Sequence, residues 1–264
     1  MFMTMALLLV SAMSAFAAKE TVKLGLFTDG DRVTEEESDQ IRAKVLEVLN
    51  SLGRFTVLDW NNDGATANVQ IDGAVNSVSY TYTEHKNDDG SKYKTYECQF
   101  NLTLTAVNLA TGETISSTSI NGTINTGFGG FGGIANVFKG ETAYNQQTAL
   151  KNTLGVASKK IKEWIEETFK AQGKVLELDE VKKDEAKTLF VSLGSDDGMV
   201  KGQKFTVKLK TTVAGRERLK EIGEAQIEAV EGGDISFCKV KKGGKEIYKA
   251  FTETPESLVV ETKK

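Results

Sequence analysis

Few side chains in this sequence could support catalysis or metal binding. Its single histidine, His85, lies in the polar stretch HKNDDGSK at residues 85–92. A serine or cysteine nucleophile needs a base, which is most often a histidine held in place by a third group. A zinc site would have to combine this one histidine with two distant cysteines. We therefore predict no catalytic residue, no metal site and no cofactor, and we expect His85 to be a solvated loop residue.

Three glycines reproduce the spacing of a dinucleotide-binding fingerprint. Gly127, Gly129 and Gly132 fit the pattern G-x-G-x-x-G. In a dinucleotide site these glycines follow the first strand of a parallel β-α-β unit, and an acidic residue comes about 20 positions later. Here they come after two antiparallel strands, and no Gly-Lys-Ser or Gly-Lys-Thr follows to form a phosphate loop. We interpret the stretch as a glycine-rich loop or linker.

The same loop carries large apolar side chains that a soluble protein seldom leaves uncovered. Two arrangements are open: the side chains fold back on their own sheet, or they form an exposed patch that another protein covers. We keep them as candidate partner-binding residues, and they are Phe128, Phe131, Ile134, Val137 and Phe138.

The charge balance argues against a nucleic-acid partner. The chain has 33 Lys and Arg against 37 Asp and Glu, and its cations are spread over both halves without a basic stripe. Its two cysteines, Cys98 and Cys238, could pair in an oxidising compartment, but they lie in segments that we expect to belong to different domains. We favour two separately buried thiols.

The first residues have the composition of a secretory signal peptide. Residues 1–10 are almost wholly apolar, and Ala15-Phe16-Ala17 is an A-x-A cleavage pattern just before the first charges. The alternative is a short buried helix, because so short an apolar run cannot span a bilayer. We expect cleavage after Ala17. Since no cysteine lies near that point to carry a lipid, we expect a soluble protein exported to the periplasm.

Hydrophobic spacing predicts an α/β domain over residues 18–172. A strand at 22–27 is followed by a helix whose start is marked by Thr34 and Glu37, the two members of a capping box. A second strand at 54–60 completes a β-α-β unit with parallel strands. Three antiparallel strands and a long helix follow, so we expect a mixed sheet covered by the capped helix and the long helix.

The composition changes at about Gly173, where we place a domain boundary. Six short strands separated by glycine turns occupy residues 173–264, which indicates a small all-β domain resembling a barrel or sandwich. The segment LGSDDGMVKG at 193–202 contains two turn signals close together, so we expect it to reverse the chain between strands.

The strand pair at residues 96–120 is the most informative part of the sequence. Apolar side chains occupy every second position from Tyr96 to Ala106, and Thr, Glu, Gln and Asn occupy the other face. Such alternation is typical of a strand that is buried on one side. Its length also suits a membrane-spanning strand, but we interpret it as a core strand of a soluble sheet.

The order of these elements resembles a known superfamily. Over residues 21–170 the chain is similar to the curli-secretion channel (CsgG-like) proteins, the TolB amino-terminal domain and the penicillin-binding-protein activators, chiefly through LGRFTVLD and VNLATGE. Residues 173–264 resemble more weakly the carboxy-terminal domain of flagellar assembly protein T, through LFVSLGSDDGMVKGQKFTV. The chain departs from the channel lipoproteins because it lacks a lipidation cysteine.

The resemblance implies a non-enzymatic, exported accessory protein of the bacterial cell envelope, which binds another envelope protein in assembly or secretion. It supplies no catalytic residues to transfer. The alternatives are a subunit of an outer-membrane secretion channel and, from a different class, an uncharacterised hydrolase. We expect no nucleic-acid partner and membrane association only through a protein partner, and an oligomer is compatible with the sequence.

Overall fold

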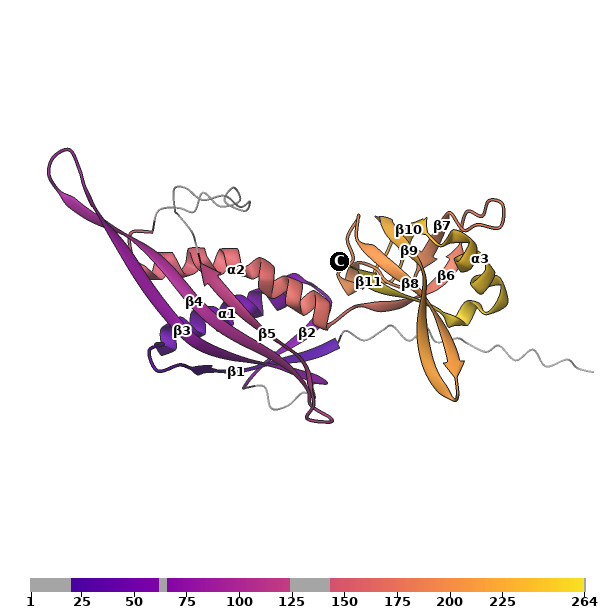
Figure 1. The fold of residues 1–264 in the computed structure, drawn as a ribbon, viewed down its shortest axis with the longest axis horizontal. Helices are drawn as coiled ribbons and strands as arrows, with labels where there is room; N and C mark the ends of the chain where they lie inside the picture. The colour runs from indigo at the N-terminus through magenta and orange to yellow at the C-terminus, as the bar shows by residue number, and fades with distance from the viewer. Residues whose placement is uncertain (1–19, 62–65, 124–142, 264) are drawn as a thin grey trace, which may run out of the picture.

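The computed structural model describes residues 20–61, 66–123 and 143–263 (Figure 1). In this part of the chain the protein is mostly β-structure, arranged as a five-stranded mixed sheet and a second, six-stranded sheet. Three α-helices accompany them, two beside the first sheet and one beside the second. The expected signal peptide, residues 1–17, lies outside the described residues. None of the described helices has the length and hydrophobicity that crossing a membrane requires.

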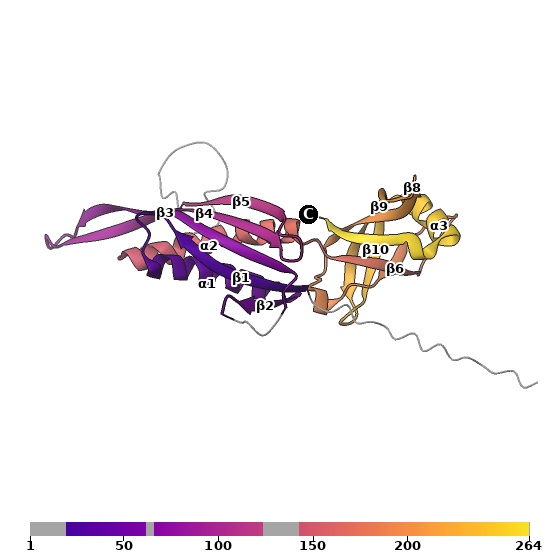
Figure 2. The same cartoon turned by 90° about the horizontal axis from the view of Figure 1, so that it is seen from below.

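The first sheet mixes parallel and antiparallel strands in the order β2-β1-β3-β4-β5. Strand β1 is parallel to β2 and β3, whereas the β3-β4 and β4-β5 pairs are antiparallel. Helices α1 and α2 pack together on one face, as Figure 2 shows, which confirms the predicted mixed sheet with two covering helices. The elements are β1 (Glu20–Asp29), α1 (Glu35–Ser51), β2 (Phe55–Asp59), β3 (Val69–Lys86), β4 (Lys92–Asn108), β5 (Thr114–Thr123) and α2 (Gln146–Thr168).

The β1-α1-β2 unit has both helix ends marked by sequence. The Thr34 hydroxyl accepts a hydrogen bond from the Glu37 amide (3.3 Å), and the Glu37 carboxylate accepts one from the Thr34 amide (2.9 Å). This reciprocal cap satisfies amides that the first turn leaves without partners. Just past the helix, Gly53 adopts a φ of 70°, which a glycine reaches without strain. The capping box and the parallel pairing are confirmed.

The first sheet buries one face beneath its two helices, and no other element of the described residues covers the second face. On β4 the predicted apolar positions, such as Phe100 and Leu102, are buried beneath the helices. On the opposite face polar side chains bond to one another: the Asn76 amide donates to Asn101 (2.5 Å), and the Asn101 amide donates to Asn121 (2.5 Å). No described helix packs on this polar face. The alternation at 96–106 is therefore that of a core strand, as predicted.

Strands β3 and β4 continue well beyond the rest of the sheet. Pairing of β1 with β3 ends at Val75, and β5 pairs with β4 no further than Gln99. Past these points no other strand of the described residues pairs with β3 and β4, and Figure 1 shows them projecting as a two-stranded ribbon. The expected loop at 85–92 is too long, because cross-strand pairing extends to Lys86 and Lys92 and leaves only residues 87–91 as the turn.

The second sheet consists of the six strands that the sequence predicted. Its order is β10-β7-β6-β11-β8-β9, all pairs are antiparallel, and β9 also pairs with β10. The strands are β6 (Gln172–Leu178), β7 (Thr188–Val191), β8 (Lys204–Val213), β9 (Arg216–Val230), β10 (Ser236–Lys242) and β11 (Leu258–Lys263).

The prediction of an all-β second unit is wrong, because it contains helix α3 (Gly244–Glu253). This helix packs against β9 and β11 and buries Ile247 and Ala250. It begins after Gly243 and has no side-chain cap, so the usual start signal of a helix is missing from the sequence.

The two sheets meet at the end of α1. Gly198, with a φ of 72°, lies so close to the Leu52 carbonyl oxygen that no Cβ would fit between them. Beside this contact the Ala171 amide donates to the Thr262 hydroxyl (3.1 Å), which extends the pairing of β6 with β11 toward the end of α2. The segment 193–202 does reverse the chain as expected, and it also forms part of this contact.

Each sheet has its own hydrophobic cluster. The first cluster draws its buried side chains from Val22 to Phe169, and the second draws them from Val175 to Val260. Cys98 is buried in the first cluster and Cys238 in the second, and both are free thiols.

Candidate functional site

The projecting part of β3 and β4 concentrates exposed aromatic side chains. We name residues 78–86 and 92–98 the aromatic arm; its base, at Val78 and Cys98, is buried in the first hydrophobic cluster. Tyr82 is 60% exposed and Tyr93 is 38% exposed. A large apolar ring left in water loses the free energy that burial would gain, so several such rings on one projection indicate a contact surface.

Cross-strand pairing sets the ring contacts of the aromatic arm. Tyr82 lies opposite Tyr96 with ring centroids 6.2 Å apart, and His85 stacks on Tyr93 at 4.7 Å. The Lys94 ammonium lies 4.2 Å from the centroid of the Tyr82 ring, within the range of a cation–π contact. Because neighbours already hold these rings, a partner that binds them removes little further side-chain freedom.

The residues before α2 add another ring at the base of the aromatic arm. The Ala143 carbonyl accepts a hydrogen bond from the Tyr96 amide (2.8 Å), so the chain enters α2 directly beside β4. This places the Tyr144 ring 6.0 Å from that of Tyr93. Tyr144 is 65% exposed.

An open hollow of about 560 Å³ lies at this base. Tyr96 and Tyr144 line it together with Glu36 and the polar side chains of residues 145–147. The Gln147 amide donates to the Glu36 carboxylate (2.9 Å), which fixes both side chains. Rings offer flat apolar contact, whereas amides and carboxylates exchange hydrogen bonds, so this arrangement suits binding.

His85 is not the loop residue that the sequence predicted. It belongs to β3, its ring stacks on Tyr93, and its Nε2 lies 2.8 Å from the Thr95 hydroxyl oxygen. Pairing that continues to Lys86 draws it into the strand. Among the described residues no group of three or more His, Cys, Asp or Glu side chains could hold a metal ion.

Tyr80 attaches the aromatic arm to α1. Its hydroxyl donates a hydrogen bond to Glu37 Oε1 (2.8 Å), and Glu37 is the same residue that caps the helix. Burial, reinforced by this hydrogen bond, raises the pKa of Tyr80 above its ordinary value. The hydroxyl therefore remains a donor throughout the neutral range.

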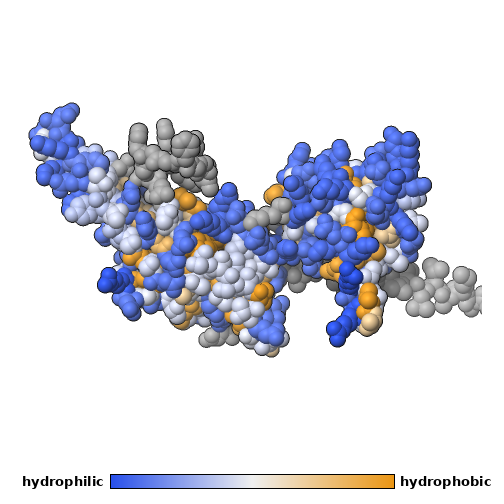
Figure 3. All heavy atoms as spheres, viewed as in Figure 1, coloured by the Kyte–Doolittle hydropathy of each residue, from blue (hydrophilic) through white to orange (hydrophobic). Residues whose placement is uncertain are grey.

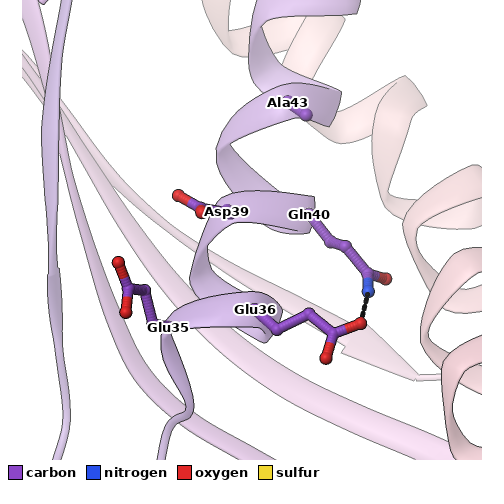
Figure 4. Close-up of a pocket in the computed structure, with 5 residues that line it drawn as sticks. All are labelled: Glu35, Glu36, Asp39, Gln40 and Ala43. Carbon is purple, nitrogen blue, oxygen red and sulfur yellow. Dashed lines mark hydrogen bonds between the residues drawn. The ribbon is translucent and has the colours of Figure 1, made fainter.

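The exposed start of α1 forms an acidic hollow of about 510 Å³ (Figure 4). The carboxylates of Glu35 and Glu36 lie in the first turn, where the positive end of the helix dipole stabilises them. The Gln40 amide donates to Glu36 (3.4 Å), so that carboxylate is engaged on two sides. Helix stability accounts for this cluster, and we assign it no ligand.

Another hollow, of about 700 Å³, lies where the two sheets meet. Arg54 lines it, and the Nε and Nη2 atoms of this side chain are buried without a hydrogen-bond partner among the described residues. Burial lowers the pKa of Arg54, and the neighbouring carboxylates Glu166 and Glu20 oppose that shift. Cations and carboxylates line the hollow in equal number, so its charge selects neither an anion nor a cation.

The five partner-binding candidates from the sequence, Phe128, Phe131, Ile134, Val137 and Phe138, lie outside the described residues. The described residues on either side of them are Thr123, which lies opposite Gln99, and Ala143, which lies beside Tyr96. Thr123 and Ala143 both lie near the base of the aromatic arm.

Sequence reasoning missed the rings of the aromatic arm itself. A signal existed, because aromatic residues flank the polar stretch 85–92 on both sides, in YTYTEH and KYKTYE. If all of residues 85–92 are assigned to a loop, the predicted strands on either side of it are too short. The cross-strand ring pairs Tyr82–Tyr96 and His85–Tyr93 are consequently not evident from the sequence.

No family model and no curated protein matches the chain. Similar solved structures include a PelC dodecamer from Paraburkholderia phytofirmans, at 12% identity and TM-score 0.35 over 57% of this chain and 87% of that chain. TolB from Acinetobacter baumannii matches at 10% identity and TM-score 0.28 over 86% of this chain and 39% of its own. A minor lipoprotein from the same organism matches at 12% identity and TM-score 0.26, over 56% and 92% of the two chains.

TolB is also one of the proteins that the sequence resembles, over a shorter stretch. Because these TM-scores are all below 0.5, the likenesses carry no argument about function. Membership of the curli-secretion channel superfamily, and the relation of the second unit to flagellar assembly protein T, stay predictions.

Proposed function

We propose that this protein is an exported, non-enzymatic accessory protein of the cell envelope that acts by binding another envelope protein. Residues 1–17 are its proposed signal peptide, cleaved after Ala17, and the periplasm is its proposed location. The aromatic arm is the proposed contact surface, and Phe128, Phe131, Ile134, Val137 and Phe138 remain proposed partner-binding residues.

The exposure of ordered rings on a projecting ribbon is the observation that supports this proposal most directly. Tyr82 and Tyr144 are each more than half exposed, although each ring touches a neighbouring ring. Tyrosine is enriched at protein interfaces because it combines an apolar body with a hydroxyl that can be satisfied. A ribbon that projects from the sheet can also reach a partner without requiring the core to move.

The secretion-channel alternative finds less support in the aromatic arm. A strand that faces lipid needs a continuous apolar side. On one face of the arm Tyr82 neighbours the ion pair of Glu84 and Lys92, and on the other His85 neighbours Thr95. Both faces are thus partly polar.

Site-specific crosslinking in cells that produce the protein tests the proposal. A photoreactive phenylalanine analogue replaces Tyr82 in one variant and Val200, a 62% exposed residue of the second unit, in the matched control. We expect one discrete adduct with another envelope protein from position 82 and none from position 200.

A second pair of changes shows whether the rings contribute to the contact. Tyr93→Ser and Tyr144→Ser, added to the position-82 variant, should reduce the adduct about tenfold, because each removes a ring from the surface. Circular dichroism checks that the fold is retained. Equal adducts from positions 82 and 200, or an adduct that survives both serine changes, would overturn the proposal.

A further inference from the structure

A second projecting hairpin, far from the aromatic arm, extends from the second sheet. β11 pairs with β8 no further than Leu209, and β10 pairs with β9 only from Glu224 onward. Between these limits β8 and β9 pair only with each other, around a turn at Ala214 and Gly215. We name residues 210–221 the basic hairpin.

The two faces of the basic hairpin differ in charge. Arg216, Arg218 and Lys220 occupy alternate positions of β9, so their side chains share one face. None of the three makes an ion pair within the described residues, which include the whole of the second sheet. The single ion pair of the hairpin, Lys210 with Glu217 (2.6 Å), lies on the opposite face.

The tip of the basic hairpin carries an exposed aliphatic side chain beside a cation. Val213, which adjoins the turn opposite Arg216 on the basic face, is 55% exposed, whereas Leu219, 44% exposed, lies on the other face opposite Lys210, at the base of the hairpin. Figure 3 shows hydrophilic and apolar residues side by side at the lower end of this hairpin, which hangs below the second unit. Neither aliphatic side chain belongs to the hydrophobic cluster of the sheet.

We propose that the basic hairpin docks on an anionic lipid surface. Cations two residues apart on a strand are separated by about 7 Å, a spacing that lets each meet its own lipid phosphate. Val213 at the tip would enter the boundary between headgroups and acyl chains, as the apolar side of an interfacial segment does. This proposal differs from the expectation that the protein reaches a membrane only through a protein partner, because the contact would be direct.

A nucleic acid fits this surface less well. Three cations are few for a phosphate-backbone site, and backbone contacts need no exposed aliphatic tip. The lipid proposal rests on the proposed function only in that export gives the protein access to a membrane. The residues that would contact lipid belong to the basic hairpin, far from the aromatic arm.

Vesicle binding by the full chain tests the proposal. The probes are phosphatidylcholine vesicles with and without about one-third phosphatidylglycerol, and co-sedimentation measures the partition coefficient at low and at near-physiological salt. We expect binding to the anionic vesicles alone, weakened by salt because screening shortens the reach of the cations. Each cation contributes about a fivefold factor, so Arg216→Gln, Arg218→Gln and Lys220→Gln together should weaken binding about 100-fold.

Matched variants distinguish the effect of the hairpin cations on vesicle binding from the effect of the protein's overall charge. Lys151→Gln, Lys159→Gln and Lys241→Gln remove three charges from exposed positions elsewhere and should leave binding unchanged. Val213→Asp keeps the three cations but should weaken binding about tenfold, because its side chain can no longer enter the apolar boundary. Tyr82→Ser should bind vesicles normally, which keeps this test independent of the aromatic arm.

Three results would overturn the proposal. They are no binding of the wild-type protein to anionic vesicles, equal loss in the two triple variants, and displacement from vesicles by a single-stranded oligonucleotide that binds more tightly. The last result would assign the basic hairpin to a nucleic acid.

Discussion

Gly73 shows how closely a single residue is fitted in the first sheet. A Cβ at this position would lie 2.5 Å from the Phe27 ring, which packs against the first hydrophobic cluster. The ring therefore occupies the space that a side chain on β3 would need. Glycine is required here by contact, since Gly73 is not among the residues with positive φ.

Gly73→Ala should lower the free energy of unfolding by about 1–3 kcal/mol, because the new methyl group forces the Phe27 ring out of its packed position. The control is Gly155→Ala within α2, where a Cβ meets nothing within 4 Å. That change should raise stability by about 0.5–1 kcal/mol, since alanine favours the helix. Urea unfolding measures both, and a Gly73→Ala variant as stable as the wild type would contradict the packing argument.

At the scale of elements, the aromatic arm depends on a hydrogen bond to α1. The unfolded chain ionises Tyr80 near its ordinary pKa of about 10, whereas the folded protein holds the proton to higher pH. A raised pKa in the folded state means that this contribution to stability is intact below about pH 10 and is lost as the pH rises further.

Tyr80→Phe should therefore flatten the alkaline fall in stability. The measurement is the free energy of unfolding in urea at about pH 8 and about pH 11, on either side of the tyrosine pKa. The matched control is Tyr82→Phe, because most of that side chain is exposed. Identical pH slopes for wild type and Tyr80→Phe would show that the Glu37 contact does not hold the arm.

The elements also show what a sequence can predict here. The capping residues Thr34 and Glu37 and the alternation from Tyr96 to Ala106 are local patterns, and the structure confirms both. The length of the aromatic arm could not be predicted from local pattern, because His85 joins a strand only through its pairing with Tyr93. Long-range pairing of this kind overrides the turn-forming composition of the residues beside it.

Helix α3 and the basic hairpin were missed for other reasons. α3 starts at glycines and takes its stability from burying Ile247, which a search for caps does not register. The prediction that the chain has no basic stripe counted charges along the sequence. Alternation on β9 sorts Arg216 and Lys220 from Glu217 and thereby makes one face basic.

For the whole molecule, the two cysteines can report on the two clusters separately. Burial raises the pKa of Cys98 and that of Cys238 to about 12 each, so both thiols stay protonated and unreactive at neutral pH until their surroundings open. We propose that residues 18–172 and 173–264 are separate domains, which predicts that the two thiols become reactive at different urea concentrations.

Alkylation of the Cys98→Ala and Cys238→Ala variants in increasing urea makes that measurement, since each variant leaves one thiol to follow. The two hydrophobic clusters share no residue, which is the reason to expect two midpoints. A common midpoint in both variants would mean that the junction at Gly198 and Leu52 couples them into one cooperative unit.

The polar face of the first sheet satisfies many of its hydrogen-bonding groups internally. Its amides and hydroxyls are already engaged with one another, as in the Asn76–Asn101–Asn121 chain and the Thr105–Ser117 pair. A surface whose donors and acceptors satisfy each other gives a passing molecule little to exchange for its bound water. We therefore expect this broad face to bind other molecules weakly. Unspecific association there would then not compete with contacts made at the two projecting ribbons.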